Sequence, residues 1–195
     1  MIIGLTGGSG CGKTTALDVI QDMGGLILDC DAIYHRLLET SDSLLCAIDA
    51  RFPGVVCGGK LERKKLGALV FSDPQALLDL NAIAHGAVKE EVLRLLQPRP
   101  KLAAIDAIAL FEGNLAELCD YTVAITAPRE SRIARLMARE GISREYAGSR
   151  IDAQKTDHWF STMADFTLVN NSTRQAFSAE ARKLFQSLWD EYQRN

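Results

Sequence analysis

The sequence has few of the features that build disulfide frameworks, metal clusters or strongly charged binding surfaces. Its five cysteines are odd in number and contain no C-x-x-C pair, so we expect them to stay as reduced thiols. The three histidines lack metal-ligand spacing. The formal net charge is only −3, with acidic and basic residues mixed along the chain, which gives no reason to expect a nucleic acid or a membrane surface as partner. A small-molecule partner is favoured instead.

Long hydrophobic runs are also missing. No apolar stretch approaches the roughly 18 residues of a membrane-spanning helix, and the sequence shows no basic leader with a cleavage site. A cytoplasmic protein is therefore expected. Internal repeats, low-complexity tracts and Gly/Ser linkers are absent as well, which argues against a cleanly separate second domain. Because 47% of the 195 residues are apolar, they suffice for the core of one domain over residues 1–195.

What the chain does have is a glycine-rich motif near its start. Residues 7–14 read GGSGCGKT, a full match to G-x-x-x-x-G-K-[ST], between an apolar run and a segment with apolar residues at helical spacing. Glycines let the backbone N–H groups curl around phosphate oxygens at a helix N-terminus. Lys13 is expected to reach the β- and γ-phosphates, and Thr14 to offer its hydroxyl to Mg²⁺. The motif predicts a nucleoside triphosphate site formed by Gly8, Ser9, Gly10, Cys11, Gly12, Lys13, Thr14 and Thr15.

Short apolar runs alternate with longer helical segments. The runs of strand length lie at 2–6, 26–28, 102–105, 122–125 and 166–169. This alternation predicts an α/β fold with a five-stranded parallel sheet between layers of helices. The long gap between the second and third strands is expected to be helical, with an N-cap at Asp73 followed by Pro74 at the first helical position. The last helix carries an apolar stripe expected in the core, formed by Phe177, Ala181, Leu184, Phe185, Leu188, Trp189 and Tyr192.

Carboxylates follow two of these strands, at the edge where α/β sheets bind ligands. Asp29 and Asp31 have the i, i+2 spacing that places both on one side of an extended chain. One of the two is alternatively the N-cap of a helix opening at Ala32. Asp106 closes the third apolar run, an arrangement that supports Mg²⁺ in phosphate-loop enzymes.

An arginine-rich segment follows the fourth strand. Arg132, Arg135 and Arg139 are spaced i, i+3 and i+7, hence on one face of a helix. A row of guanidinium groups suits a lid over phosphates, and Gly141 would let such a lid hinge. The alternative is a solvated helix face paired with its own glutamates.

Taken together, these residues resemble the dephospho-CoA kinases, phosphate-loop enzymes that transfer the ATP γ-phosphate to the ribose 3′-hydroxyl of dephospho-CoA. The resemblance spans nearly the whole chain. Besides the phosphate loop, it is carried by Asp29-Cys30-Asp31, Gly59-Lys60-Leu61-Glu62-Arg63, Leu80-Asn81-Ala82-Ile83-Ala84-His85, Leu110-Phe111-Glu112, Ser143-Arg144, Ala153-Gln154 and Asn170-Asn171-Ser172.

The resemblance implies a role for individual residues. Asp31 takes the proton of the 3′-hydroxyl, Arg139 reaches from the lid to the transferring phosphoryl group, and Arg135 and Asn170 contact the nucleotide. Lys13 is the third catalytic residue, and Thr14 with Asp106 holds Mg²⁺. ATP and dephospho-CoA are the implied substrates, for a monomer or small homo-oligomer. The implied organisation is a nucleotide-binding core at 1–31 and 101–195, a helical acceptor-binding insertion at about 32–100 and a helical lid at about 129–157.

The chain departs from the family pattern at Gly86 and Ala109, where prolines are usual, and over residues 156–160. Another small-molecule kinase, acting on a nucleoside or nucleotide, would carry the same loop, metal and lid. A GTPase switch is a further alternative, because residues 154–157 read QKTD, similar to a guanine-reading N-K-x-D motif. That motif should follow a strand, whereas here a helical pattern precedes it.

Overall fold

The structure is a computed structural model that describes residues 1–194. The chain forms two compact units, one from residues 1–28 and 99 onward, the other from residues 29–98. Within residues 1–194, no helix has both the length and the apolar character needed to cross a membrane.

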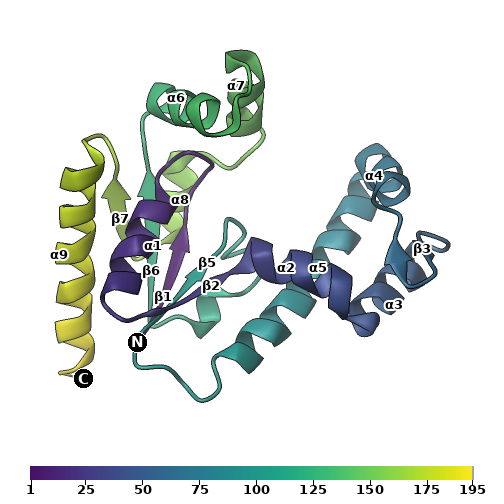
Figure 1. Ribbon diagram of the computed structural model, residues 1–195, viewed down its shortest axis with the longest axis horizontal. Helices are drawn as coiled ribbons and strands as arrows, with labels where there is room; N and C mark the ends of the chain where they lie inside the picture. The colour runs from purple at the N-terminus through teal and green to yellow at the C-terminus, as the bar shows by residue number, and fades with distance from the viewer. Residues whose placement is uncertain (195) are drawn as a thin grey trace. The chain divides into compact units, whose positions relative to one another are not determined.

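The larger unit is organised by a parallel sheet (Figure 1). Its spatial order is β2-β5-β1-β6-β7, so β1 lies in the centre with β5 and β6 on either side. The strands are β1 (Ile2–Thr6), β2 (Leu26–Asp29), β5 (Ala103–Asp106), β6 (Tyr121–Thr126) and β7 (Phe166–Val169). The five-stranded parallel sheet predicted from the apolar runs is confirmed, with ends shifted by a single residue at most. Because parallel strands end at the same edge, the residues after β1 and β5 become neighbours.

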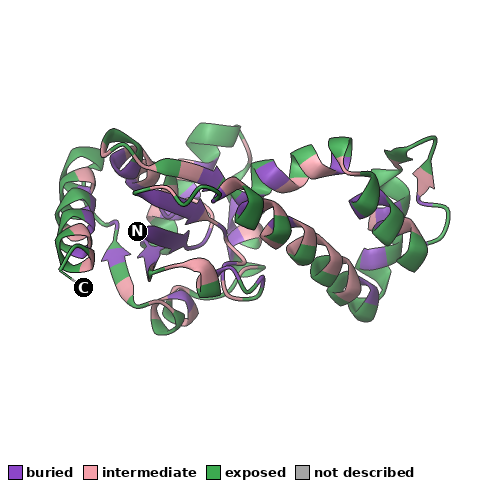
Figure 2. Ribbon diagram, turned by 90° about the horizontal axis from the view of Figure 1, so that it is seen from below, coloured by how far each residue is buried: buried purple, intermediate pink, exposed green. Residues whose placement is uncertain are grey.

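One face of this sheet is covered by α1 (Lys13–Asp22) and α9 (Arg174–Tyr192). Phe177, Ala181, Phe185 and Leu188 of α9 pack in the same core as Ile3 and Leu5 of β1, as the stripe predicted. On the solvent side the two helices are joined by ion pairs of Arg174 with Asp18 and Arg182 with Asp22, both 2.9 Å. Figure 2 shows the strands as the most continuously buried part of this unit.

The opposite face is covered by α8 (Asp157–Met163) and by the chain that follows β5. Successive strand residues point to opposite faces, so Gly4 faces away from Ile3 and Leu5. A Cβ at Gly4 would lie 2.8 Å from Cys119 Sγ and from Leu110 Cδ2, which shows how closely this layer approaches the sheet. It also contains a short 3₁₀ helix, η1 (Ala116–Leu118).

Two further helices form a hairpin in the larger unit, α6 (Arg129–Glu140) and α7 (Arg144–Asp152). They enclose a small apolar cluster of their own, formed by Ile133, Leu136, Ala147 and Ile151. Gly141 ends α6 in the left-handed conformation, with φ 66°, which glycine adopts without steric cost.

The smaller unit is mostly helical, as expected. It contains α2 (Cys30–Thr40), α3 (Asp42–Arg51), α4 (Arg63–Ser72) and α5 (Pro74–Leu95) around a core that includes Leu44, Ile48, Phe52, Val55, Leu66 and Val70. Asp73 caps α5 by accepting a hydrogen bond from the Gln75 N–H at 2.8 Å, and Pro74 follows at the first helical position, which confirms that prediction.

The prediction of an entirely helical gap is wrong at one point. An antiparallel ribbon of β3 (Val56–Cys57) and β4 (Lys60–Leu61) joins α3 to α4. Its turn is made by Gly58 and Gly59, both at positive φ, a conformation that non-glycine residues rarely adopt. Two residues per strand are too few to leave an alternating apolar pattern in the sequence.

Candidate active site

The phosphate-loop motif connects β1 to α1, the context that its chemistry requires. Gly7, Gly10 and Gly12 have positive φ. A Cβ at Gly7 would lie 2.2 Å from the carbonyl oxygen of Ile125, and one at Gly12 would lie 2.1 Å from Asn170 Nδ2. Glycine is therefore required at both positions, by the backbone conformation and by the close approach of β6 and of the residue after β7.

Lys13 and Asp106 lie together beside this loop. Lys13 Nζ donates a hydrogen bond to the Gly7 carbonyl oxygen at 3.0 Å and lies 4.0 Å from Asp106 Oδ1. Both side chains are 17% exposed. Asp106 ends β5, which pairs with β1, so the sheet places a cation and a carboxylate at the mouth of the loop. Thr14 is the second residue of α1 and is exposed.

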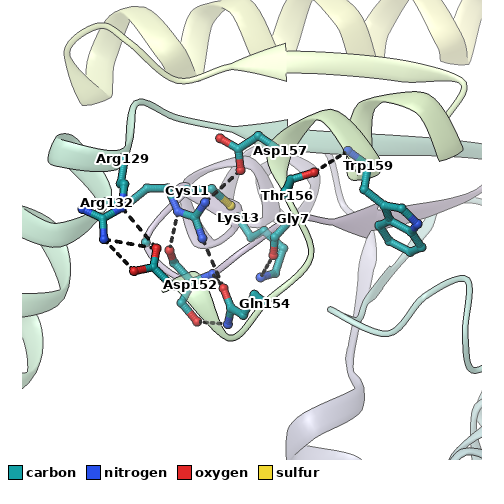
Figure 3. A network of polar contacts seen from close by, with 12 residues as sticks. Gly7, Cys11, Lys13, Arg129, Arg132, Asp152, Gln154, Thr156, Asp157 and Trp159 are labelled. Carbon is teal, nitrogen blue, oxygen red and sulfur yellow. Dashed lines mark hydrogen bonds and ion pairs between the residues drawn. The ribbon is translucent and has the colours of Figure 1, made fainter. Parts of the chain in front are cut away.

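Arg132 reaches the loop from α6. Its side chain is only 4% exposed, and its Nε donates to the Ser9 carbonyl oxygen at 2.9 Å. The other guanidinium nitrogens donate to Asp157 Oδ1 at 2.8 Å and to Gln154 Oε1 at 3.2 Å. Figure 3 shows Arg132, Gln154 and Asp157 converging beside Cys11 and Lys13.

Arg135 and Asn170 hold the next part of the loop. Arg135 donates to the carbonyl oxygens of Gly10 and Cys11 at 3.1 and 3.2 Å, and to Asn170 Oδ1 at 3.0 Å. Asn170 is buried, and its Nδ2 donates to the Cys11 carbonyl oxygen at 2.9 Å. Three hydrogen bonds thus join this part of the loop to α6 and to the residue after β7, and a fourth links Arg135 to Asn170.

The Cys11 thiol is the one ionisable group buried inside the loop itself. Burial raises the pKa of this thiol, against a smaller opposing effect of the nearby Lys13 cation. A thiol with a raised pKa stays neutral near pH 7, so Cys11 adds no negative charge where phosphates would bind.

The arginine row divides between two kinds of contact. Arg132 and Arg135 contact the loop, whereas Arg139 is 60% exposed and pairs with Glu140. Arg129 likewise pairs with Asp152 at 2.8 Å, and Arg144 pairs with Glu130. The glutamate-paired interpretation therefore describes Arg139, whereas Arg132 and Arg135 bond to carbonyl oxygens of the loop. The structure does not place Arg139 with the loop residues, and a lid over phosphates stays a prediction.

The two strand-end carboxylates take different places in the smaller unit. The helix begins at Cys30, earlier than Ala32, so the prediction that both carboxylates lie on one side of an extended chain is wrong. Asp29 is the N-cap, and its Oδ1 accepts a hydrogen bond from the Ala32 N–H at 3.0 Å. Asp31 lies in the first turn of α2 with its side chain exposed. Of the pair, Asp29 is the capping residue.

Three residues at the loop had no role in the sequence-based site. The sequence places Arg132 only in the arginine row, Gln154 only in the Ala153-Gln154 motif and Asp157 only in the QKTD stretch. For Arg132 the sequence does offer a signal, because its i, i+3 spacing from Arg135 places the two side chains on the same face of a helix. Gln154 and Asp157 lie in the connection after α7 and at the start of α8, not after a strand, so the similarity to a guanine-reading motif has no structural counterpart.

Comparisons with known proteins place these features in a family. A model of the dephospho-CoA kinase family matches residues 1–176. The dephospho-CoA kinase of Anaeromyxobacter dehalogenans is 36% identical over 193 residues, covering 96% of this chain and 92% of that protein. That of Thermobifida fusca is 32% identical, covering 98% of this chain and 96% of the relative.

Solved structures agree. A crystal structure from Thermus thermophilus has a TM-score of 0.79 at 34% identity, covering 97% of both chains. The dephospho-CoA kinase of Campylobacter jejuni has a TM-score of 0.70 at 25% identity, covering 98% of both chains. A shikimate kinase of Acinetobacter baumannii, with a TM-score of 0.56 at 17% identity over 97% of this chain and 93% of its own, shares the fold alone. With the family match extending from β1 into α9, the chain belongs to the dephospho-CoA kinase family.

Proposed function

We propose that the chain transfers the γ-phosphoryl group of ATP to the ribose 3′-hydroxyl of dephospho-CoA, giving coenzyme A and ADP. The observation that carries this proposal is the pairing of Lys13 with Asp106 at the mouth of the phosphate loop, in a chain of this family. The phosphotransferase chemistry follows from family membership. The residue assignments below are the more specific part of the proposal.

The donor side rests on the loop and its supports. The loop N–H groups and the Lys13 ammonium group would bind the β- and γ-phosphates. Arg135 and Asn170 fix the Gly10 and Cys11 carbonyl oxygens, so they act on the nucleotide by holding the loop. Such preorganisation favours the transition state of phosphoryl transfer, which needs positioning and charge stabilisation more than covalent help.

Mg²⁺ would be held by the Thr14 hydroxyl and the Asp106 carboxylate. These are hard oxygen donors of the kind magnesium takes, and in nucleotide sites the metal keeps only one or two protein ligands beside water and phosphate. The Thr14 hydroxyl near the start of α1 and the Asp106 carboxylate at the end of β5 therefore fit the ion as its protein ligands. When bound, it neutralises charge on the phosphates.

On the acceptor side, Asp31 would accept the proton of the 3′-hydroxyl group. At the same time the 3′-oxygen would bond to the γ-phosphorus, and the bond between the γ-phosphorus and the ADP oxygen would break. The Asp31 carboxylate is exposed in the first turn of α2, whereas Asp29 is used in capping. General base catalysis of this kind contributes roughly 10²- to 10⁴-fold. Arg139 would contribute charge stabilisation from α6 after leaving its contact with Glu140.

The test is ATP consumption by the purified chain with dephospho-CoA, compared with a panel of nucleosides and nucleotides. We expect ADP and coenzyme A in equal amounts with dephospho-CoA, and loss of turnover when EDTA removes magnesium. Turnover with a nucleotide but none with dephospho-CoA would contradict the proposal and would indicate a kinase that acts on another small molecule.

A further inference from the structure

Every polar atom of Ser9, the third residue of the phosphate loop, is bound by side chains that come from more than 120 positions further along the chain. Its N–H donates to Gln154 Oε1 at 2.9 Å, and its hydroxyl accepts from Gln154 Nε2 at 2.7 Å. Its carbonyl oxygen accepts from Arg132 Nε at 2.9 Å. We call Arg132 and Gln154 together the Ser9 clasp.

The hydrogen bonds of the Ser9 clasp allow only one orientation of the Gln154 side-chain amide. Gln154 Oε1 accepts from both the Ser9 N–H and Arg132, the latter at 3.2 Å. A flipped amide would turn its NH₂ group toward these two donors. Arg132 is in turn fixed by Asp157, at 2.8 Å, in an environment that leaves it 4% exposed. The fit is also close in space, since a Cβ at Gly8 would lie 2.1 Å from a terminal nitrogen of Arg132.

We propose that Gln154 is a positioning residue for the phosphate donor, acting through Ser9. The inference rests on the proposed function, because it takes this loop as the ATP site. A glycine-rich loop loses more backbone entropy on ordering than other segments. The two hydrogen bonds between Gln154 and Ser9, one donated by each residue, hold the loop in its binding conformation before ATP binds. ATP binding then loses less free energy to the ordering of the loop.

The clasp also joins the loop to two elements at once. Arg132 belongs to α6, and Gln154 lies in the connection between α7 and α8. Gln154 is therefore the contact through which the segment after the α6–α7 hairpin fixes the loop. Losing it should affect the donor and leave acceptor binding unchanged.

The decisive variant is Gln154→Leu, which keeps the size of the side chain and removes both hydrogen bonds with Ser9, together with one acceptor of Arg132. Because these hydrogen bonds hold the loop ready for ATP, we expect the Kd for ATP to rise about 10-fold when they are lost. The KM for ATP should rise with it, while the KM for dephospho-CoA stays within about twofold. Gln186→Leu is the matched control, because Gln186 is exposed on α9 and bonds to Asp190.

Ser9→Ala provides a second variant, which removes only the hydroxyl contact. We expect a Kd for ATP about threefold higher than that of the wild type. In a Gln154→Leu background the same substitution should add nothing, since its partner is already gone. Faster amide hydrogen exchange over residues 7–13 in Gln154→Leu, measured without nucleotide, would support the same role and needs no turnover.

Two outcomes would overturn the inference. One is an ATP affinity in Gln154→Leu equal to that of Gln186→Leu. The other is an equal rise of both substrates' KM values, which would mean general damage. These results differ from a failure of the proposed function, in which the wild-type chain binds ATP by calorimetry but does not phosphorylate dephospho-CoA.

Discussion

Asn170 Nδ2 donates a hydrogen bond to the Cys11 carbonyl oxygen at 2.9 Å, across 159 positions of sequence. The same carbonyl oxygen accepts from Arg135 at 3.2 Å, and Arg135 also donates to Asn170 Oδ1. The three residues form a closed polar network in which the side-chain oxygen and nitrogen of a buried amide are both bonded. Such networks are stabilising when complete and costly when one member is lost.

Asn170→Ala should therefore destabilise the fold as well as the nucleotide site. Arg135 would lose an acceptor and the Cys11 carbonyl oxygen one of its donors, at a cost of about 2 kcal/mol in the free energy of unfolding. Urea denaturation measures this directly, and ATP affinity should fall in parallel. Asn171→Ala is the matched control, because Asn171 is exposed. Equal stabilities of the two variants would contradict the structural role of the amide.

A second prediction concerns glycine-to-alanine changes in two settings. Gly12 has φ 108°, and a Cβ there would lie 2.1 Å from Asn170 Nδ2. Gly12→Ala should abolish measurable ATP binding. Alanine strains the backbone at this positive φ, and the buried Asn170 amide can move away from the new Cβ only at a high cost in free energy. Gly86 lies within α5, and a Cβ there would point into open space beyond the helix's own backbone.

Gly86→Ala should have the opposite effect on stability. Alanine is better than glycine in a helix interior by about 1 kcal/mol, so the midpoint of thermal unfolding should rise while ATP binding is unchanged. Calorimetry on both variants, with and without ATP, separates the two cases. A stable, ATP-binding Gly12→Ala protein would rule out the loop geometry described above.

Ionisation of Cys119 should make the free energy of unfolding depend on pH in the alkaline range. Burial, with smaller effects of the Asp120 and Asp165 carboxylates, raises the pKa of this thiol to about 12. In the unfolded chain the thiol ionises near pH 8.5. Between these values unfolding releases a proton, so stability falls as pH rises, by up to about 1.4 kcal/mol per pH unit. Below about pH 7 the thiol is protonated in both states and contributes almost no slope.

The measurement compares urea midpoints from pH 7 to pH 10.5 for the wild type and for Cys119→Ala. The variant should be less stable at pH 7, because it loses the packing of a partly buried sulfur, but its stability should decline less steeply above pH 9. Some slope should persist, since burial also raises the pKa values of Cys11 and Tyr34. Parallel curves for the two proteins would show that Cys119 ionises in the folded state.

Much of the fold could be predicted because its signals are local. Each strand of the parallel sheet is a short apolar run, and Asp73-Pro74 starts a helix through its own side chain and ring. The β3–β4 ribbon could not be predicted in the same way, since two-residue strands carry no period. The start of α2 at Cys30 depended on which of two aspartates capped it, and either spacing was compatible with the sequence.

The residues of the candidate site likewise include some that the sequence could predict and some that it could not. The Lys13 and Asp106 positions followed from a motif and from the end of a strand. The contacts of Arg132, Gln154 and Asp157 did not, because they depend on how α6 and the chain before α8 meet the loop. A helical row of arginines fixes which residues share a face, but not which of them find acceptors. Arg132 and Arg135 bond to loop carbonyl oxygens, whereas Arg139, one turn further on, pairs with Glu140.

The last prediction separates the two aspartates near the start of α2. Asparagine caps helices about as well as aspartate, so Asp29→Asn should keep both the fold and most of the turnover. Asp31→Asn removes the carboxylate proposed to accept the 3′-hydroxyl proton, and turnover should fall by roughly 10²-fold or more while ATP binding is retained. Steady-state kinetics with dephospho-CoA, together with calorimetric ATP titration, measures both effects. If both variants turn over alike, Asp31 has only a surface role and the base lies elsewhere; if Asp29→Asn alone is inactive, the assignment of the pair is reversed.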